Sequence, residues 1–588
     1  MTRVVLIGAV LIGAALRLIP VGYGLPFIYH PDETHLLSDF GKFLESASRG
    51  APTIGASTFY YPLALVYAAY FAYGRVTGHF ASVADFKTAF VLDDPTLHLI
   101  GRLFSVACSV GALVAVYAIG RRLHGHHGGA IAAALMATSV VDIAGSHWLK
   151  FDSAVVLMSL ISLLAILRLQ DDVLSRRLHV AAGVAVGLAV AGRIDLLVLV
   201  PLLVVAHVIF TGPSTLAEAA RAAVHRHVLA ALGVAAVVYL VVSFTLADVV
   251  LEYVVGAPSL FTTREMGASL VQFLLAGDVL MSIRHNIPFY ASTVFVGGCG
   301  VVLTAAITLA VLHRLRVLRA EDAVLFVFLG LLLVPTLLFN VYGTHYFLRV
   351  LPLLMVVTAG GLLWLSTRVE GVAGRHAWIL LLAVVIAEPA RQSVRYVDYL
   401  RTNTDTRTRA REWLYREIPF GTTIAVQKFH ELPAYLPPLN ESPGQIERKL
   451  AAVRAAGTSS GIVFAARLQR PPHDVYRIVN VSGQSYWAAA GRDLENLYDF
   501  DALKTSGATH LVTSGFNTLL PINDDGSPIG ILLADRAIDR ASLARYEAFN
   551  TRLRREAALV AEFTVSDVRI ARLTDAPIDP TVRIYRLP

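Results

Sequence analysis

Two adjacent carboxylates follow directly on the first apolar segment of the chain, residues 4–24. They belong to the stretch Tyr29-His30-Pro31-Asp32-Glu33-Thr34-His35, which also holds two histidines. Charged side chains beside a lipid bilayer are costly and are kept mainly for function. A carboxylate placed there can act as a general base toward a hydroxyl group or hold a divalent cation. The alternative is that Pro31 begins a helix whose solvated first turn carries the acids.

Further charges occur in three short segments between apolar stretches. They are Lys150 with Asp152, Arg193 with Asp195, and His345 with Arg349. An arginine can hold a phosphate by paired hydrogen bonds, so such a group suits a substrate that is half lipid and half polar. Each pair also has a structural alternative: a loop ion pair for the first, a turn pair for the second, and an interfacial aromatic for His345. We expect these side chains to meet the acidic stretch in one pocket at one membrane face.

The composition excludes an ordinary soluble protein. Of 588 residues, 55% are hydrophobic and 16% are charged, and the mean hydropathy is +0.60, whereas soluble domains carry about 25% charged residues. The formal net charge of +7 indicates cytoplasmic loops that face anionic lipid and does not suggest nucleic acid. The two cysteines, Cys108 and Cys299, lie inside apolar segments, so we expect core residues and neither a disulfide nor a metal site.

Apolar segments of membrane-spanning length predict about eleven transmembrane helices. They lie at about residues 4–24, 97–119, 128–146, 153–169, 178–192, 195–211, 228–247, 288–312, 323–340, 349–366 and 377–394. Arginines gather in the loops that fall on one side under this count, so the positive-inside rule makes that side cytoplasmic. The acidic stretch and the later charge pairs then lie on the outer side. Residues 59–73 fit a helix at the interface, and Arg17 is expected to reach the outer face.

The C-terminal region, residues 395–588, differs from the rest because its charge density rises and its apolar runs shorten. Five runs are typical of strands: 422–427, 460–465, 510–513, 559–565 and 582–587. Helices are expected over 443–456, with Ser442 as N-cap, and over 405–417. We therefore expect two domains, a transmembrane domain at 1–394 and an extracytoplasmic α/β domain at 395–588.

The order of these motifs resembles that of GT-C glycosyltransferases, in the group that contains the protein O-mannosyltransferases and the lipid A aminoarabinose transferases. The similarity covers residues 1–394. Besides the acidic stretch, its carriers are Tyr61-Pro62-Leu63, Gly101-Arg102-Leu103-Phe104-Ser105, Lys150-Phe151-Asp152, Gly192-Arg193 and His345-Tyr346-Phe347-Leu348-Arg349. Two positions depart from the family pattern. The family often has a second proline after Pro62, and it often has lysine in place of Arg193, which keeps the charge but changes the geometry toward phosphate.

The resemblance implies a mainly α, GT-C type integral membrane enzyme. It would move a sugar from polyprenyl or dolichyl phosphate to an acceptor hydroxyl at the outer membrane face, with inversion. Asp32 would be the catalytic base, supported by Glu33, and Asp152 would orient the site. The candidate partners of the donor phosphate are Lys150, Arg193, His345, Arg349 and Arg102.

The resemblance leaves the metal and the acceptor open. Where relatives use Mg²⁺ or Mn²⁺, Asp32 and Asp152 are the candidate ligands here, and no other cofactor is implied. The acceptor is a protein, a lipid or a glycan. The long outer loop, residues 248–287, could order over the donor as a lid.

A transporter or flippase of a lipid-linked substrate is the main alternative. Transporters bind near the membrane midplane and often contain internal repeats, whereas the charges here gather at one face and no repeat is visible. An oligosaccharide polymerase, which needs a pyrophosphate-linked donor, is a second alternative. Release of sugar from a labelled lipid donor separates the enzyme from the transporter.

Overall fold

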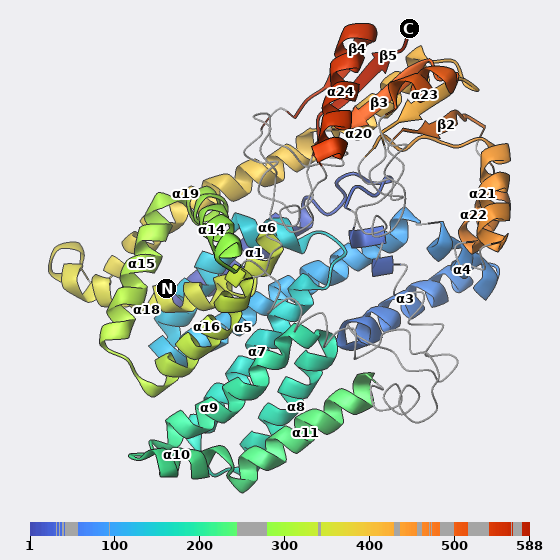
Figure 1. Ribbon diagram of the computed structural model, residues 1–588. Helices are drawn as coiled ribbons and strands as arrows, with labels where there is room; N and C mark the ends of the chain where they lie inside the picture. Colours follow the sequence, from blue (N-terminus) through green and yellow to red (C-terminus); the bar gives the residue numbers. More distant parts are fainter. Residues whose placement is uncertain are drawn as a thin grey trace. The chain divides into compact units, whose positions relative to one another are not determined.

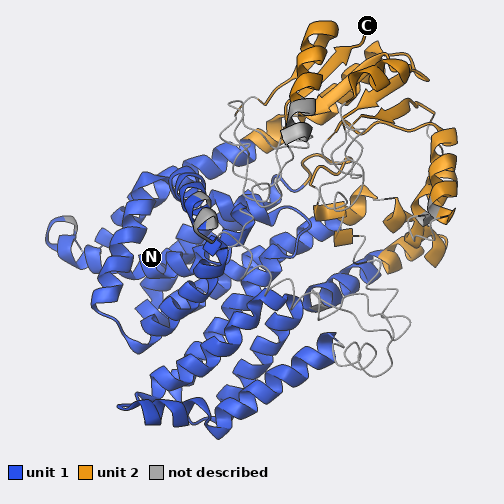
Figure 2. Cartoon of the chain, in the orientation of Figure 1, with its two compact units in different colours: residues 1–21, 39–70, 99–398 blue, residues 22–38, 71–98, 399–588 orange. Residues whose placement is uncertain are grey.

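The chain forms two compact units (Figure 2). The first contains residues 1–21, 39–70 and 99–398, and the second contains residues 22–38, 71–98 and 399–588. The computed structural model describes residues 1–30, 32–34, 36–37, 40, 57–92, 94–243, 279–338, 343–374, 376–427, 436–455, 461–469, 471, 473–481, 499–514, 540–565, 567 and 579–588. The predicted lid, 248–287, lies outside the described residues up to position 278. The predicted division at residue 394 stays a prediction.

The first unit is helical in its described residues (Figure 1). Its elements are α1 (Thr2–Leu18), α5 (Pro95–Ala137), α6 (Val140–Ser146), α7 (Asp152–Leu167), η1 (Arg168–Asp171), α8 (Arg176–Gly192), η2 (Ile194–Val198), α9 (Leu199–Thr211), α10 (Leu216–Ala223), α11 (Arg226–Ser243), α14 (Val279–Phe289), the π-helical η4 (Tyr290–Cys299), α15 (Gly300–Arg316), α16 (Ala320–Leu338), α17 (Thr344–Phe347), α18 (Leu351–Ala373) and α19 (Ala377–Thr402). Helix α3 (Ser57–Thr77), which contains the predicted interfacial helix, begins in the first unit and ends in the second. Helix α5 begins in the second unit, and helix α19 ends in it.

Eight helices in the described part of the chain are long and apolar enough to cross a membrane. Helices α1 and α8, with 17 residues each, are shorter than these eight but coincide with two further predicted segments. The multi-pass membrane character predicted from the sequence is therefore confirmed, whereas the count of eleven stays a prediction.

Helix α5 accounts for two predicted segments because the chain reverses inside it. Gly125 has φ 73° and ψ −176°, which interrupts the helix. The two arms then lie against each other, since a Cβ atom at Gly129 would be 2.6 Å from the carbonyl oxygen of Tyr117. Glycine at position 129 allows this close approach, because any side chain would collide with the backbone of the other arm.

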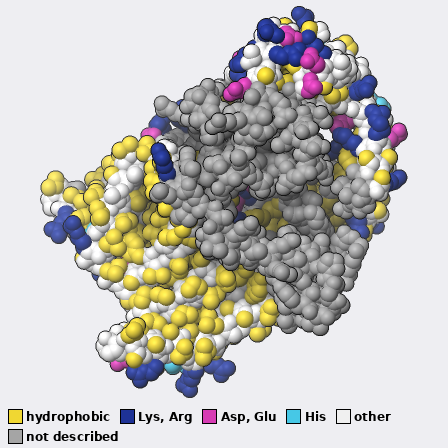
Figure 3. Space-filling model, in the orientation of Figure 1, with side chains coloured by type: hydrophobic (Ala, Val, Ile, Leu, Met, Phe, Trp, Pro, Cys, Tyr) yellow, Lys and Arg dark blue, Asp and Glu magenta, His cyan; other side chains and the backbone are white. Residues whose placement is uncertain are grey.

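The surface of the first unit is apolar, as a membrane protein requires. Figure 3 shows hydrophobic side chains over much of its visible face, with Lys and Arg mainly at the edges. Each of five large apolar side chains that face outward is more than half exposed: Leu229, Val237, Val241, Leu309 and Leu312. Such side chains are stable when they face lipid, because lipid tails do not impose the hydrophobic cost of water.

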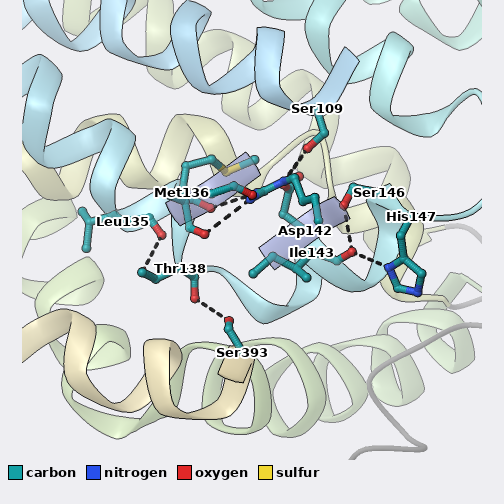
Figure 4. Close-up of polar contacts among 12 residues, drawn as sticks. Ser109, Leu135, Met136, Thr138, Asp142, Ile143, Ser146, His147 and Ser393 are labelled. Atoms are coloured by element: carbon teal, nitrogen blue, oxygen red, sulfur yellow. Dashed lines mark hydrogen bonds and ion pairs between the residues drawn. The ribbon is translucent and has the colours of Figure 1, made fainter. Parts of the chain in front are cut away.

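A buried arginine joins α1 to the turn between α5 and α6. Arg17 is fully buried, and its Nε donates to Ser109 Oγ at 2.8 Å. Its guanidinium also pairs with Asp142 and donates to the carbonyl oxygens of Met136 and Ala137, which end α5. Figure 4 shows Ser109 and Asp142 pointing toward one another, and Ser109 Oγ donates to Asp142 Oδ2 at 3.1 Å. The prediction that Arg17 reaches the outer face is wrong, because a carboxylate and carbonyl oxygens at the end of α5 hold its charge inside.

The second unit contains a mixed sheet of five strands in the order β2-β1-β3-β5-β4. The strands are β1 (Thr423–Val426), β2 (Arg477–Asn480), β3 (His510–Ser514), β4 (Ala558–Phe563) and β5 (Val582–Arg586), and the helices are α4 (Val83–Val91), α20 (Thr406–Glu417), α21 (Pro443–Ala455), α22 (Gly461–Gln469), α23 (Phe500–Thr505) and α24 (Arg540–Glu556). Strand β1 is parallel to β2 and β3, whereas β5 is antiparallel to β3 and β4. Ala410 and Leu414 of α20 pack in one core with Ile424 and Val582 of the sheet. The predicted α/β character of this region is therefore confirmed.

One predicted strand, 460–465, is wrong because this segment forms helix α22. Its Ile462-Val463-Phe464 run is typical of strands. The residues that follow, from Ala465 to Gln469, are good helix formers and extend the segment into a helix. The sequence did not predict the short strand β2, which forms one edge of the sheet and pairs with β1.

Candidate functional site

A continuous chain of ion pairs joins three loops of the first unit. Lys150 Nζ lies 3.2 Å from Asp152 Oδ2, and Arg193 Nη1 lies 3.4 Å from Asp152 Oδ1. Arg193 Nε lies 3.1 Å from Asp195 Oδ2, and the same oxygen accepts from Arg349 Nη1 at 2.6 Å. In these pairs of the described residues, three cationic side chains face two carboxylates.

The neighbouring helices hold this charge chain in place. Asp152 begins α7, where the helix dipole favours a carboxylate. The backbone of Lys150 is fixed from α5, because Ser105 Oγ donates to the Lys150 carbonyl oxygen at 3.0 Å. Arg193 ends α8, and its guanidinium carbon lies 4.9 Å from the centre of the Phe151 ring. The charges are therefore presented from helix ends, where backbone groups and side chains both limit their movement.

The cluster is partly open to the outside of the unit. The side chain of Lys150 is 6% exposed and that of Asp152 is 8% exposed, whereas those of Arg193 and Asp195 are 26% and 35% exposed. The arginine end is therefore the accessible end. An anion that arrives there could bind both guanidinium groups and replace Asp195 as their shared partner.

Two predicted phosphate partners lie in other surroundings. Arg102 is fully buried, and its Nη1 donates to the carbonyl oxygen of Val21 at 2.8 Å. Its guanidinium carbon also lies 4.9 Å from the centre of the Trp148 ring, so its contacts link α5 to the end of the first segment. The His345 ring lies 3.9 Å from the Tyr346 ring, centre to centre. These contacts, which lie within the described part of the chain, differ from the ion pairs that join Lys150, Asp152, Arg193, Asp195 and Arg349.

The acidic stretch belongs to the second unit. The Asp32 side chain is 52% exposed, whereas Glu33 is fully buried. The backbone N–H of Asp32 donates to His30 Nδ1 at 3.2 Å, and that of Glu33 donates to the His30 carbonyl oxygen at 3.2 Å. Because His30 Nδ1 accepts a hydrogen bond, it carries no proton in this arrangement. Asp32 therefore presents the accessible carboxylate of the stretch, and Glu33 does not.

The predicted cation site does not fit Asp152. Its two carboxylate oxygens already face Lys150 and Arg193, and two positive neighbours oppose a divalent cation. Within the described residues, no group of three or more His, Cys, Asp or Glu side chains is arranged to hold a metal ion. Asp152 is thus better suited to bridging Lys150 and Arg193 than to binding a cation, and a cation held by Asp32 and Asp152 stays a prediction.

Sequence reasoning missed the links between loops. The pairs Lys150–Asp152 and Arg193–Asp195 are two residues apart and were visible as local patterns. The pair of Arg349 with Asp195 spans 154 residues, and no spacing rule indicates it. Ser105 was identified only as the last residue of the motif 101–105, and its hydrogen bond to the backbone of Lys150 was not predicted.

Residues 97–244 match the family model described as dolichyl-phosphate-mannose-protein mannosyltransferase. This segment contains Arg102, Lys150, Asp152 and Arg193. The match confirms the resemblance to the mannosyltransferase group found in the sequence. Comparison with curated protein sequences gives no significant match.

Several solved structures are similar to the chain at low identity. An oligosaccharyltransferase from Archaeoglobus fulgidus, tethered with an acceptor peptide, is 13% identical with a TM-score of 0.41, and the match covers 73% of this chain and 62% of that chain. The same enzyme in complex with Zn and sulfate is 13% identical with a TM-score of 0.43, over 87% and 68%. ArnT from Cupriavidus metallidurans bound to undecaprenyl phosphate is 13% identical with a TM-score of 0.38, over 83% and 84%. The chain thus spans less than two thirds of the first of these structures.

Proposed function

We propose that this chain, whose residues 97–244 match the mannosyltransferase family model, is a membrane GT-C glycosyltransferase that moves a sugar from a polyprenyl or dolichyl phosphate to an acceptor hydroxyl. The reaction takes place at the outer membrane face, and the C-terminal region lies on that side. The donor phosphate is the leaving group. The convergence of Arg193 and Arg349 on one carboxylate oxygen of Asp195 is the observation that carries this proposal.

Arg193 and Arg349 hold the leaving phosphate in this mechanism. Both guanidinium groups face the same carboxylate oxygen of Asp195, so they already converge on a single anionic atom. A phosphate oxygen has the charge and the acceptor capacity to take that place. Lys150 and Asp152 fix the orientation of Arg193 from behind, since Asp152 bridges the two cations. The negative charge that develops on the phosphate during bond cleavage is then stabilised by fixed donors.

Asp32 acts as the general base. Its half-exposed carboxylate can accept the proton of the acceptor hydroxyl as that oxygen attacks the anomeric carbon. The bond between the anomeric carbon and the phosphate oxygen breaks on the opposite face of the sugar, which inverts the configuration. Buried Glu33 supports the backbone turn at His30 and does not receive the proton.

The substitution Asp32→Asn tests this assignment. Asparagine keeps the shape of the side chain but cannot accept the proton, so the rate of transfer should fall by about 10²–10⁴-fold. The measurement is sugar transfer from a labelled polyprenyl phosphate donor by the purified protein. Asp474→Asn, at an exposed aspartate of the same unit, is the matched control and should leave the rate unchanged. An Asp32→Asn enzyme that is as fast as wild type shows that Asp32 is not the base.

A further inference from the structure

The backbone that leads to Asp32 is fastened to the C-terminal region within the second unit. Tyr29, three residues before Asp32, is 2% exposed. Its hydroxyl lies 2.6 Å from Thr408 Oγ1, and its carbonyl oxygen accepts from Arg407 Nη1 at 3.2 Å. Tyr23 extends this contact, because its hydroxyl donates to Asp405 Oδ2 at 3.1 Å. Tyr23 and Tyr29, on the N-terminal side of Asp32, therefore both have polar partners at the start of α20.

Arg407 is the centre of these contacts and is itself rigidly held. Its Nε donates to Asp405 Oδ1 at 2.8 Å and its Nη2 donates to Asp405 Oδ2 at 2.7 Å, which forms a bidentate pair. Both side chains are about 1% exposed. The guanidinium carbon lies 4.1 Å from the centre of the Tyr29 ring, close enough for a cation–π contact. A buried planar guanidinium with both edges and one face in use has little freedom to move.

A second arginine one turn further along α20 repeats the arrangement. The Arg411 guanidinium carbon lies 5.0 Å from the centre of the Phe27 ring and 4.0 Å from that of Tyr415. Its Nε donates to the carbonyl oxygen of Pro438 at 3.0 Å. Residues 407 and 411 are four apart and lie on one face of the helix. That face of α20 is therefore matched to the aromatic side chains of residues 27–29.

The same broad face of α20 is also fixed to the sheet, because positions 410 and 414 follow 407 and 411 at helical spacing. Ala410 and Leu414 are fully buried in a core with strands β1 and β5. The start of the helix is held as well, because the backbone N–H of Thr406 donates to Asp579 Oδ1 at 2.6 Å and Thr406 Oγ1 donates to the Pro580 carbonyl oxygen at 2.6 Å. Helix α20 thus connects the sheet core to the residues before Asp32 without a flexible step.

We infer that Arg407, clamped by Asp405, is a positioning residue for the catalytic base, so that α20 sets the place of Asp32. The inference rests on the proposed function, because it assumes that Asp32 receives the proton. It assigns helix α20 of the C-terminal region a part in the chemistry. A general base must lie within hydrogen-bond reach of the proton that it takes, and misplacement by about 1 Å can cost about 100-fold in rate.

Three substitutions test the inference. Arg407→Met removes the guanidinium, Arg407→Lys keeps the charge without the bidentate geometry, and Tyr29→Phe removes only the hydroxyl that meets Thr408. Arg416→Met is the matched control, because Arg416 lies on the same helix but is 69% exposed and forms an exposed ion pair with its neighbour Glu417. We expect kcat to fall about 100-fold for Arg407→Met, less for Arg407→Lys, and about tenfold for Tyr29→Phe, with an unchanged KM for the donor. Arg416→Met should match the wild type.

Hydrogen exchange distinguishes positioning from a general loss of structure. In Arg407→Lys and Tyr29→Phe, peptides covering residues 27–37 should exchange faster, whereas peptides of β5 should not change. If Arg407→Met fails to fold because Asp405 is left unpaired, these two milder variants decide the matter. Wild-type kcat together with wild-type exchange in both milder variants would overturn the inference, and so would faster exchange throughout the second unit.

A combination with Asp32→Asn separates this inference from the proposed function. If Arg407 acts through Asp32, Arg407→Lys should add no further loss to the residual rate of Asp32→Asn. Additive losses contradict the inference. Full activity of Asp32→Asn alone contradicts the proposed function instead, whatever the Arg407 variants do.

Discussion

The carboxylate of Asp195 occupies the place that we assign to the donor phosphate, so its removal should tighten donor binding. Asp195→Asn keeps the size of the side chain and removes its charge. In the wild type one Asp195 oxygen lies 3.1 Å from Arg193 Nε and 2.6 Å from Arg349 Nη1. Each partly exposed ion pair of this kind contributes about 0.5–1 kcal/mol. Without these two ion pairs to break, the free energy of donor binding should be more favourable by about 1–2 kcal/mol, which corresponds to about 5–30-fold tighter binding.

The assay is the KM for a polyprenyl phosphate sugar, measured alongside the binding of the same polyprenyl phosphate without the sugar. Both values should fall by about 5–30-fold in Asp195→Asn, with little change in kcat. Asp171→Asn is the matched control, because Asp171 makes an exposed bidentate pair with Arg122 in the same unit, away from the charge chain. An unchanged or higher KM in Asp195→Asn refutes the idea that phosphate and Asp195 compete for Arg193 and Arg349.

Two further predictions concern stability. Arg17→Met should destabilise the first unit by about 3–5 kcal/mol, because it leaves the carboxylate of Asp142 buried without its arginine. The double variant with Asp142→Leu should recover much of this loss, and thermal unfolding in detergent measures the stability of both variants. A double variant no more stable than Arg17→Met would contradict this account. In the second unit, hydrogen bonds from Lys504, Arg552 and Arg555 lower the pKa of Glu556 from 4.5 to about 2. Because the pKa of Glu556 is lowered in the folded state, the stability that these contacts contribute is fully present above pH 4.5 and is lost as the pH falls toward 2. Hydrogen exchange of α24 should therefore accelerate in acid in the wild type, and the acceleration should be absent in Glu556→Gln.

The membrane part of the fold was predictable because lipid imposes one strong rule. A segment that crosses the bilayer has to satisfy its backbone internally and expose apolar side chains, so hydropathy alone located the helices. The reversal of the chain at Gly125 could be anticipated from the arginines beside it. The close packing of the two arms of α5 could not be anticipated, because it depends on the contact of Gly129 with Tyr117. Segment 460–465 was predicted wrongly because strand and helix propensities conflict within it.

The site was predictable only where its contacts are local. Lys150 with Asp152 and Arg193 with Asp195 were identified from their spacing, and their alternative reading as ion pairs agrees with the contacts that they make. The bridges to Arg349 and from Arg17 to Asp142 join residues more than a hundred positions apart, and a single sequence contains no local signal for such partners. The same is true of Arg407 and Tyr29. Long-range polar pairs depend on how whole elements pack, which propensities do not describe.

The bond between Tyr29 and Thr408 spans 379 residues, which has a consequence for biosynthesis. A ribosome that adds about 5–20 residues per second needs about 20–75 seconds to travel that distance. During this interval the nascent protein has already produced the segment around Tyr29 but has not yet produced its anchor. With Asp32 positioned through α20, as we infer, catalytic competence would arrive late, after the last third of the polypeptide has emerged and folded, and a prematurely terminated translation product would be inert.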